Sequence, residues 1–478
     1  MSKLKGITME RKQRDPYTEF TPEELQAIFG GDPAKMGGPG GPPADGPGGP
    51  GGPPAPIFGK DEEATACIIV DHGKLDEENM NEAGRGTTPF TASRADGIQI
   101  IASDGHTGGV YCTGEGTDFT LENAVIAISG NGPDGMLGGK SMAVEATDHA
   151  KVTIKNCDIS ASGVSRSTTI CQNHGEMRIY NSTLVAHGAP WGSSAREHRP
   201  SAKYREFEGN ARNHCTMAGG KTWFYNCKIY TDGWAAVSTD AAQGYVYVEA
   251  NDCDIKTRSG YAAYADNGCY DVFNRCKIKS GAMAAVLAGE CGITYNGCKI
   301  DCDSYFVKVH CVMGRPIELA YLDVNGCDIK SKSTALLSRS ANAEINVRSS
   351  SILAENGELL KAEANPDPGA TKTGGKEVYG VHGAFTDCEL QGDVISADPD
   401  RDVYVYLNHT VLTGAIHGAF LTLDGKSKWT ASKDSDVTII GEFDSSQIDA
   451  PAGVTITAKG GEDGTYTLAS GGALILKK

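Results

Sequence analysis

Short apolar segments recur along the chain, and each one begins with a small residue, a charged residue and an aliphatic residue. Examples are Cys253-Asp254-Ile255, Cys276-Lys277-Ile278 and Cys298-Lys299-Ile300. Such alternation with a period of two predicts a short strand with one buried face. Asparagine stands one or two places before most copies, which suits a left-handed bend between strands. A Gly or Ser and a second apolar run follow most copies, so we expect two or three strands in every repeat.

The copies recur at a basal period of 22 to 26 residues, with longer intervals where insertions fall. This is the period of a solenoid, in which each repeat buries its apolar face against its neighbours. A leucine-rich repeat has a similar period, but the turn from Cys276 to Gly297 contains only Leu287. We therefore predict an all-β fold, a single parallel β-helix of about 11–13 coils. Because stacked coils lie about 4.8 Å apart, the repeated cysteines should form an inward ladder of thiols.

The repeated turns, from Asn156-Cys157-Asp158-Ile159 to Cys388-Glu389-Leu390, resemble those of the right-handed parallel β-helix superfamily. That superfamily includes pectate lyases, rhamnogalacturonases, epimerases and adhesin-like proteins. The resemblance covers roughly residues 95–475 and implies a right-handed solenoid. The stretches Leu421–Asp424 and Val437–Ile440 also look like the last coils of adhesin-like β-helices. No catalytic motif of the superfamily carries over residue by residue, so the resemblance implies an architecture and leaves the activity open.

The ends and the insertions interrupt this repeat. Thr21-Pro22-Glu23-Glu24 is a capping box, so residues 1–36 should hold a short helix, Pro22 to Phe29, that caps the open end of the solenoid. Residues 37–56 are Gly or Pro at 17 of 20 positions, a linker or an arm toward a second copy of the chain. The β-helix should fill residues 57–478, with insertions near 130–141, 185–221 and 357–380.

Charge and cysteine content narrow the function classes. A net charge of −17 repels phosphate backbones and anionic lipid, so we expect no nucleic-acid partner and no membrane partner. The N-terminus lacks an apolar signal region, and no apolar run is long enough to span a membrane. Fifteen cysteines without a C-x-x-C pair suggest reduced, buried thiols, a cytoplasmic location and no zinc site. No cofactor and no metal are predicted.

Candidate site residues come from the longest insertion and from outward positions of the coils. The 45-residue interval before Cys227 is the densest polar and aromatic cluster of the chain, and loops on a rigid scaffold often carry function. Sequence-distant side chains can also line up on one face of stacked strands. We assign the catalytic candidates as His198, Tyr204, Arg205, Asp240, Asp266, Lys308 and His310. The candidate substrate-binding residues are Trp191, Arg196, His214 and Lys361.

Two classes of function fit these residues. The first is an enzyme that abstracts a proton from a polyhydroxylated or carboxylated small molecule or oligosaccharide, with His198, Tyr204 or Lys308 as base and a cation such as Arg205 to hold the carboxylate. A hydrolytic variant would use Asp240 and Asp266 as paired carboxylates. The alternative is a non-catalytic, adhesin-like module that binds a glycan or a partner. The abundant thiols and the absent signal region favour the enzyme.

Overall fold

The computed structural model describes residues 64–132, 138–163, 165–188, 212–240, 244–310, 319–366, 379–460 and 463–478. The chain divides into two units, Met1–Gly37 and Gly38–Lys478, and all described residues belong to the second. The expected helix Pro22 to Phe29 and the Gly/Pro segment 37–56 lie outside the described residues. The described part is almost entirely β-structure, with one short 3-10 helix, η1 (Ser445–Gln447). None of its helices is long and apolar enough to cross a membrane.

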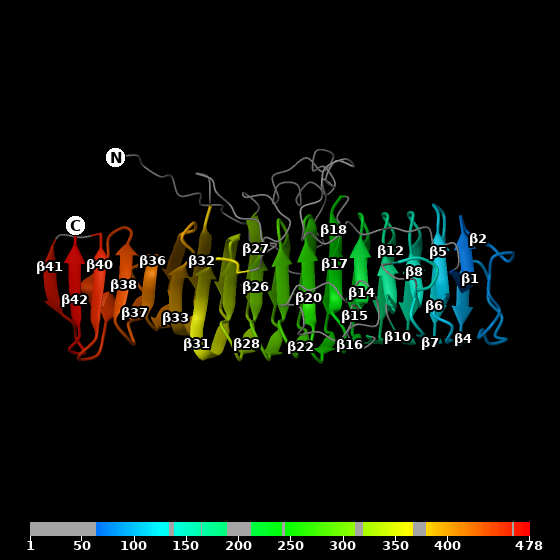
Figure 1. Cartoon of the computed structure of the whole chain (residues 1–478), viewed down its shortest axis with the longest axis horizontal. Coiled ribbons are helices and arrows are strands. Elements are labelled where there is room, and N and C mark those ends of the chain that lie inside the picture. The colour runs from blue at the N-terminus through cyan, green and yellow to red at the C-terminus, as the bar shows by residue number, and fades with distance from the viewer. Residues whose placement is uncertain are drawn as a thin grey trace. The chain divides into compact units, whose positions relative to one another are not determined.

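The strands pair in parallel with the strands one repeat earlier and one repeat later, which makes the described unit a β-solenoid (Figure 1). This confirms the all-β, mostly parallel stack predicted from the repeats. Three stacks of strands form its sides, called here sheets A, B and C. The strands of sheet A are β1 (Thr65–Asp71), β5 (Thr107–Thr113), β8 (Val144–Ala146), β11 (Thr169–Cys171), β14 (Arg212–Met217), β17 (Ala235–Asp240), β20 (Tyr261–Asp266), β23 (Ala285–Ala288), β26 (Val307–His310) and β29 (Leu336–Arg339).

Sheet B follows sheet A in each repeat. Its strands are β3 (Arg94–Asp96), β6 (Asp118–Glu122), β9 (Lys151–Lys155), β12 (Glu176–Tyr180), β15 (Lys221–Tyr225), β18 (Val246–Asn251), β21 (Cys269–Asn274), β24 (Gly292–Asn296), β27 (Leu319–Asn325), β30 (Asn342–Arg348), β32 (Val381–Thr386), β34 (Val403–Asn408), β36 (Ile416–Leu423), β38 (Ser435–Ile439), β40 (Thr455–Lys459) and β42 (Ala473–Lys477).

Sheet C completes the repeat. Its strands are β4 (Gln99–Ala102), β7 (Val125–Ser129), β10 (Asp158–Ser162), β13 (Thr183–His187), β16 (Lys228–Thr231), β19 (Asp254–Thr257), β22 (Lys277–Ser280), β25 (Lys299–Cys302), β28 (Asp328–Ser331), β31 (Ser351–Glu363), β33 (Glu389–Ala397), β35 (Val411–Thr413), β37 (Lys428–Thr430) and β39 (Ile448–Asp449). Strands β31 and β33 run on from sheet C into sheet A without a break, and β36 runs on from sheet A into sheet B. Strands β2 (Lys74–Leu75) and β41 (Gly464–Thr467) pair antiparallel at the two ends of the stack.

A two-residue turn joins sheet B to sheet C, and its first residue has a positive φ. The residues at this position include Asn156, Asn226, Asp252 and Arg275, all with φ between 53° and 56°. The prediction of a left-handed bend next to asparagine is confirmed for Asn156 and Asn226. The asparagines two places before a cysteine have another role, because they stand at strand ends and pair with one another.

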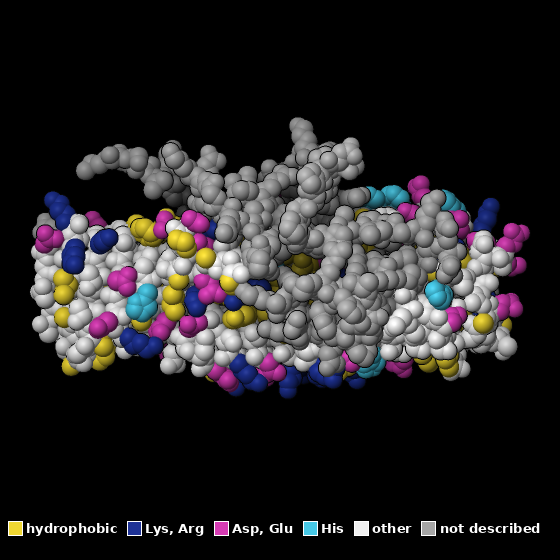
Figure 2. All heavy atoms as spheres, in the orientation of Figure 1, with side chains coloured by type: hydrophobic (Ala, Val, Ile, Leu, Met, Phe, Trp, Pro, Cys, Tyr) yellow, Lys and Arg dark blue, Asp and Glu magenta, His cyan; other side chains and the backbone are white. Residues whose placement is uncertain are grey.

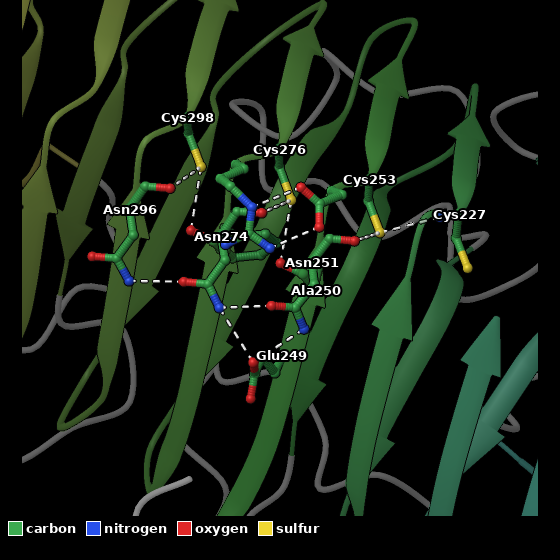
Figure 3. A network of polar contacts seen from close by, with 12 residues as sticks. Cys227, Glu249, Ala250, Asn251, Cys253, Asn274, Cys276, Asn296 and Cys298 are labelled. Atoms are coloured by element: carbon green, nitrogen blue, oxygen red, sulfur yellow. Dashed lines mark hydrogen bonds and ion pairs between the residues drawn. The ribbon is translucent and has the colours of Figure 1, made fainter. Parts of the chain in front are cut away.

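The second residue of the turn is the repeated cysteine, and its thiol serves as both acceptor and donor (Figure 3). The Cys253 thiol accepts a hydrogen bond from the Cys227 amide of the preceding repeat at 3.4 Å and donates to the carbonyl of Asn251 at 3.3 Å. Cys253, Cys276 and Cys298 stack directly because the strands that follow them pair in register. The predicted thiol ladder is therefore confirmed, and the described cysteines are all buried and free of disulfides.

Hydroxyls replace the thiol in several repeats and make the same bonds. The Ser182 hydroxyl accepts from the Cys157 amide at 3.0 Å, and the Ser350 hydroxyl accepts from the Cys327 amide at 3.0 Å. Thr410 does the same for Cys388 at 3.2 Å. The position therefore selects a small side chain that can satisfy a buried amide, which is costly to leave unpaired.

The asparagines at the ends of the sheet B strands form a second ladder beside the thiols (Figure 3). The side-chain amide of Asn274 donates to that of Asn251 at 2.9 Å, and the amide of Asn296 donates to Asn274 at 2.8 Å. Asn325 continues the series with a bond to Asn296 at 2.9 Å, and Glu249 ends it by accepting from Asn251 at 3.0 Å. These bonds join consecutive repeats through side chains as well as through the backbone.

Candidate functional site

Sheet A differs from sheet C because both of its faces are buried along much of its length, as they also are at strands β18, β21 and β24 of sheet B. Every residue of β14 and β17 is buried, whereas β22 of sheet C alternates between exposed and buried positions. Burial on both faces explains the nearly continuous apolar runs that the sequence shows here. Polar groups on the outer face are thus shielded from water, which strengthens their interactions with one another.

The register of the strands defines two outward rows on sheet A. The first row runs through Cys215, Ser238, Tyr264, Val286, Lys308, Leu337 and Lys361. The second row runs through Met217, Asp240, Asp266, Ala288, His310, Arg339 and Glu363. Five candidates, Asp240, Asp266, Lys308, His310 and Lys361, therefore lie on the predicted face. Because neighbouring strands lie about 4.8 Å apart, Asp240 and His310 are roughly 14 Å apart along the stack.

The first polar group of this face, called here the Asp240 cluster, consists of Arg212, Cys215, Ser238 and Asp240. The Asp240 carboxylate pairs with the Arg212 guanidinium at 2.8 Å and accepts from the Ser238 hydroxyl at 2.8 Å. The Cys215 thiol donates to the same carboxylate at 3.4 Å. Burial, and then the charge of Asp240, raise the pKa of the Cys215 thiol well above its usual range. The arginine also lies over the ring of Trp234, 4.1 Å from its centre.

The second polar group, called here the His310 cluster, consists of Tyr305, Lys308, His310, Arg339, Lys361 and Glu363. The Glu363 carboxylate accepts from Arg339 Nε at 2.8 Å and pairs with Lys361 Nζ at 3.1 Å. Burial alone would raise the pKa of Glu363, but the hydrogen bonds from Arg339 and Lys361 lower it. Burial would lower the pKa of Lys361, and its bond to Glu363 raises it instead. The cluster thus carries three cations and one anion on a chain whose net charge is −17.

His310 is the buried base of this cluster. The residue is only 4% exposed, and its Nε2 atom has no hydrogen-bond partner. Burial, followed by the charges of Lys308 and Arg339, lowers the pKa of His310 well below its ordinary value. The ring is therefore neutral at neutral pH and has an unused nitrogen among cations. A buried polar atom without a partner calls for an explanation, and a functional site is one such explanation.

His214 lies elsewhere, although we predicted it to bind substrate. It is fully buried and faces the interior of the solenoid, where Nδ1 lies 2.8 Å from the Thr169 hydroxyl and Nε2 lies 2.7 Å from the Thr216 hydroxyl. Its ring meets that of Phe224 edge to face, with centres 4.8 Å apart. Burial lowers the pKa of His214 to about 3. We therefore correct its assignment from the substrate face to the core, because both ring nitrogens are already satisfied there.

The remaining candidates divide into two sets. Asp266 stands next to Asp240 on the outer face, and its carboxylate accepts from the Asn267 amide at 2.7 Å. Five candidates of the longest insertion, Trp191, Arg196, His198, Tyr204 and Arg205, lie outside the described residues. The sequence analysis missed Arg339 and Arg212, which the register brings to the two clusters, and Tyr305, whose hydroxyl lies 3.5 Å from the Arg339 guanidinium. The position of Arg339 beside His310 can be inferred only when the pairing of β26 with β29 is known.

Metal chemistry has no site in the part of the chain that the structure describes. No group of three or more His, Cys, Asp and Glu side chains there is arranged to hold a metal ion. The stacked thiols do not form such a group, because each one is engaged with the backbone of its own or a neighbouring repeat.

Comparison of the chain with protein-family models, with curated proteins and with solved structures finds no match. The class of protein is therefore defined by the fold alone, as a mostly parallel β-solenoid with a buried polar face.

Proposed function

We propose that the chain is an enzyme that abstracts a proton from a carboxylated or polyhydroxylated small molecule at the His310 cluster. The observation that carries the proposal is the buried, neutral His310 ring, whose Nε2 has no partner and which lies among cations. We also propose that the solenoid winds in the right-handed sense through about 11–13 coils, as the repeats and the resemblance imply. The predicted insertion residues Trp191, Arg196, His198, Tyr204 and Arg205 stay predictions for further contacts with the substrate.

The cations of the cluster provide the reason for proton abstraction. A substrate carboxylate held by Lys308, Arg339 and Lys361 loses much of its negative charge, so the carbon next to it becomes more acidic. His310 Nε2 then accepts the proton from that carbon, and the negative charge that remains moves onto the carboxylate oxygens, facing the cations. Preorganised cations in a site shielded from water stabilise such developing charge strongly.

Substrate binding also prepares His310 for this role. In the free protein the charges of Lys308 and Arg339, together with burial, oppose protonation of the ring. A bound carboxylate offsets those charges and makes the imidazolium easier to form. The direction of this change brings the pKa of the base toward the operating pH, where general bases are most effective.

The hydrolytic variant has less support. Asp240 and Asp266 are neighbours on the outer face, but the Asp240 carboxylate already interacts with Arg212, Ser238 and Cys215. A carboxylate with three partners serves better to order its surroundings than to exchange protons with a substrate. The adhesin-like alternative needs no base, so it gives no reason for an unpaired imidazole among cations.

The test is exchange of a carbon-bound hydrogen with solvent. The full chain is incubated in D₂O with a panel of hydroxy acids, sugar acids and acidic oligosaccharides, and deuterium incorporation is measured by mass spectrometry. We expect H310Q to reduce exchange by about 10²- to 10⁴-fold, the usual contribution of a general base. K308Q should chiefly raise KM, because it removes a contact to the carboxylate.

His417 provides the matched control, since it is partly exposed, pairs with Asp436 at 3.2 Å and lies four strands from His310 along the stack. H417Q should leave exchange unchanged. Exchange at the wild-type rate in H310Q would show that this histidine is not the base. Binding of an acid without exchange, lost on K308Q, would indicate the non-catalytic function instead.

A further inference from the structure

The two outward rows of sheet A change the sign of their charge along the solenoid. On β17 and β20 their charged residues are both acidic, Asp240 and Asp266. On β26, β29 and β31 the rows carry three cations and one carboxylate, all members of the His310 cluster. Figure 2 shows basic and acidic side chains close together in the region where Figure 1 labels β26 and β31. One face of the solenoid therefore has an acidic end and a basic end.

A single strand, β23, separates the two ends, and it contributes only the apolar residues Val286 and Ala288 to the rows. Asp266 and His310 belong to the same row two strands apart, so their backbones are roughly 10 Å apart along the stack. The half-buried Tyr264 stands beside Val286 in the other row, and both belong to one apolar cluster. A ligand that reaches both charged ends must therefore cross an apolar strip.

The acidic end carries an excess of negative charge. Asp240 and Asp266 stand opposite each other on neighbouring strands, where like charges are unfavourable. Arg212 pairs with Asp240 at 2.8 Å, and its single positive charge balances only one of the two carboxylates. An ammonium group near Asp266 would balance the other.

Other kinds of acid fit the two ends less well. A dicarboxylate would bring its second negative charge to Asp266. A fatty acid would withdraw water from the Asp266 carboxylate without replacing the lost hydrogen bonds, which is costly. The unpaired Nε2 atom of His310, a residue only 4% exposed, is an independent sign that this face receives a ligand.

We propose that the substrate is a dipolar amino acid whose carboxylate and ammonium groups are separated by an apolar chain of about 10 Å. This inference rests on the proposed function, because it takes the cations of the His310 cluster as the carboxylate site. At the other end, Asp266 accepts hydrogen bonds from the ammonium group. The chain between them lies against Val286 and Tyr264.

The test compares the binding of four small probes to the full chain by isothermal titration calorimetry. The dipolar probe is 8-aminooctanoate, in which about eight single bonds separate the charged groups by roughly 10 Å. Octanoate lacks the ammonium group, suberate has a second carboxylate in its place, and 4-aminobutanoate is too short to reach both ends. The variants are D266N at the acidic end, K308Q at the basic end, and the matched control D301N at an exposed aspartate of sheet C.

We expect the wild-type chain to bind 8-aminooctanoate at least about tenfold more tightly than each of the other probes, the usual effect of a hydrogen bond between charged groups. D266N should weaken the binding of 8-aminooctanoate by about tenfold and leave octanoate unchanged. K308Q should weaken both probes, and D301N should weaken neither. Retained binding of octanoate by D266N, together with its circular dichroism, checks that this variant is folded.

The outcomes separate this inference from the proposed function. Equal affinities for 8-aminooctanoate and octanoate, both weakened by K308Q, would overturn the dipolar substrate and leave the carboxylate site standing. Binding of 8-aminooctanoate that K308Q does not weaken would refute the carboxylate site itself. Equal losses in D266N and D301N, or no binding of 8-aminooctanoate by the wild type, would also overturn the inference.

Discussion

The thiol of Cys253 is expected to stabilise the solenoid as a hydrogen-bonding group and not as apolar volume. The residue is 2% exposed, and its sulfur accepts from the Cys227 amide and donates to the Asn251 carbonyl. Cys253→Ala leaves the buried Cys227 amide unpaired, which costs about 1–3 kcal/mol. Loss of the sulfur volume adds about 0.5–1 kcal/mol. Cys253→Ser keeps both bonds, as Ser182 and Ser350 do in their repeats, so we expect it to cost less than about 1 kcal/mol.

Cys112 supplies the matched control, because its thiol is fully buried and has no hydrogen-bond partner among the described residues. Burial raises the pKa of this thiol far above its usual value, as expected in apolar surroundings. Cys112→Ser would bury an unsatisfied hydroxyl, whereas Cys112→Ala removes only volume. The order of the two substitutions should therefore be reversed, with alanine tolerated better at Cys112 and serine tolerated better at Cys253.

Amide hydrogen exchange at Cys227, followed by mass spectrometry of proteolytic fragments, reports the local effect. A loss of about 2 kcal/mol corresponds to roughly 30-fold faster exchange in Cys253→Ala. Thermal unfolding midpoints of the four variants give the global ranking. Equal destabilisation by serine and alanine at Cys253 would refute the reasoning, since it would mean that the position selects size alone.

Two further predictions concern the core and the turns. The folded chain keeps His214 neutral, with a pKa of about 3, whereas the unfolded chain binds a proton there below pH 6.5. The free energy of unfolding should therefore be highest above pH 6.5 and should fall on acidification. The loss is about 1.4 kcal/mol per pH unit, or about 2 kcal/mol at pH 5, and a His214→Gln variant should show a flatter dependence of its melting temperature on pH. Gly281→Ala should destabilise severely, because its Cβ would lie 1.7 Å from the carbonyl oxygen of Arg258. Gly326→Ala, with φ +61° and no atom within 4 Å of the added Cβ, should cost only about 1 kcal/mol. Melting temperatures should separate the two variants, and equal losses would contradict the steric argument.

The architecture could be predicted from the sequence because each repeat shows the same short pattern of small, charged and aliphatic residues. The period and the alternation around Cys253, Cys276 and Cys298 determine which residues stack, and the structure has them in register. The turns were harder to interpret. The residue with positive φ is the one directly before the cysteine, even where it is Arg275, because the geometry of the solenoid overrides the local preference for asparagine.

The site was only partly readable, because sheet A is buried on both faces. The sequence does not show which residues of β20 and β29 point outward, and only the register identifies them as Tyr264 and Leu337. Where both faces of a strand are apolar, the alternation of polar and apolar residues does not show which residues point outward. An error of one residue in the assignment then exchanges the two faces. His214 was assigned to the substrate face for another reason: it falls in the polar and aromatic insertion before Cys227, whereas the structure has it in the buried strand β14. Lys308, His310 and Lys361 lie on the outer face both in the prediction from the sequence and in the structure.

The shared bonding role of thiols and hydroxyls in the turns has an evolutionary consequence. In several repeats the turn presents an acceptor to the repeat before it and an amide to the repeat after it. A gene segment that encodes one such unit can therefore be duplicated or deleted without leaving an unmatched junction. Lineages that carry this fold should vary in length by whole units, while the character of each unit's side chains drifts freely.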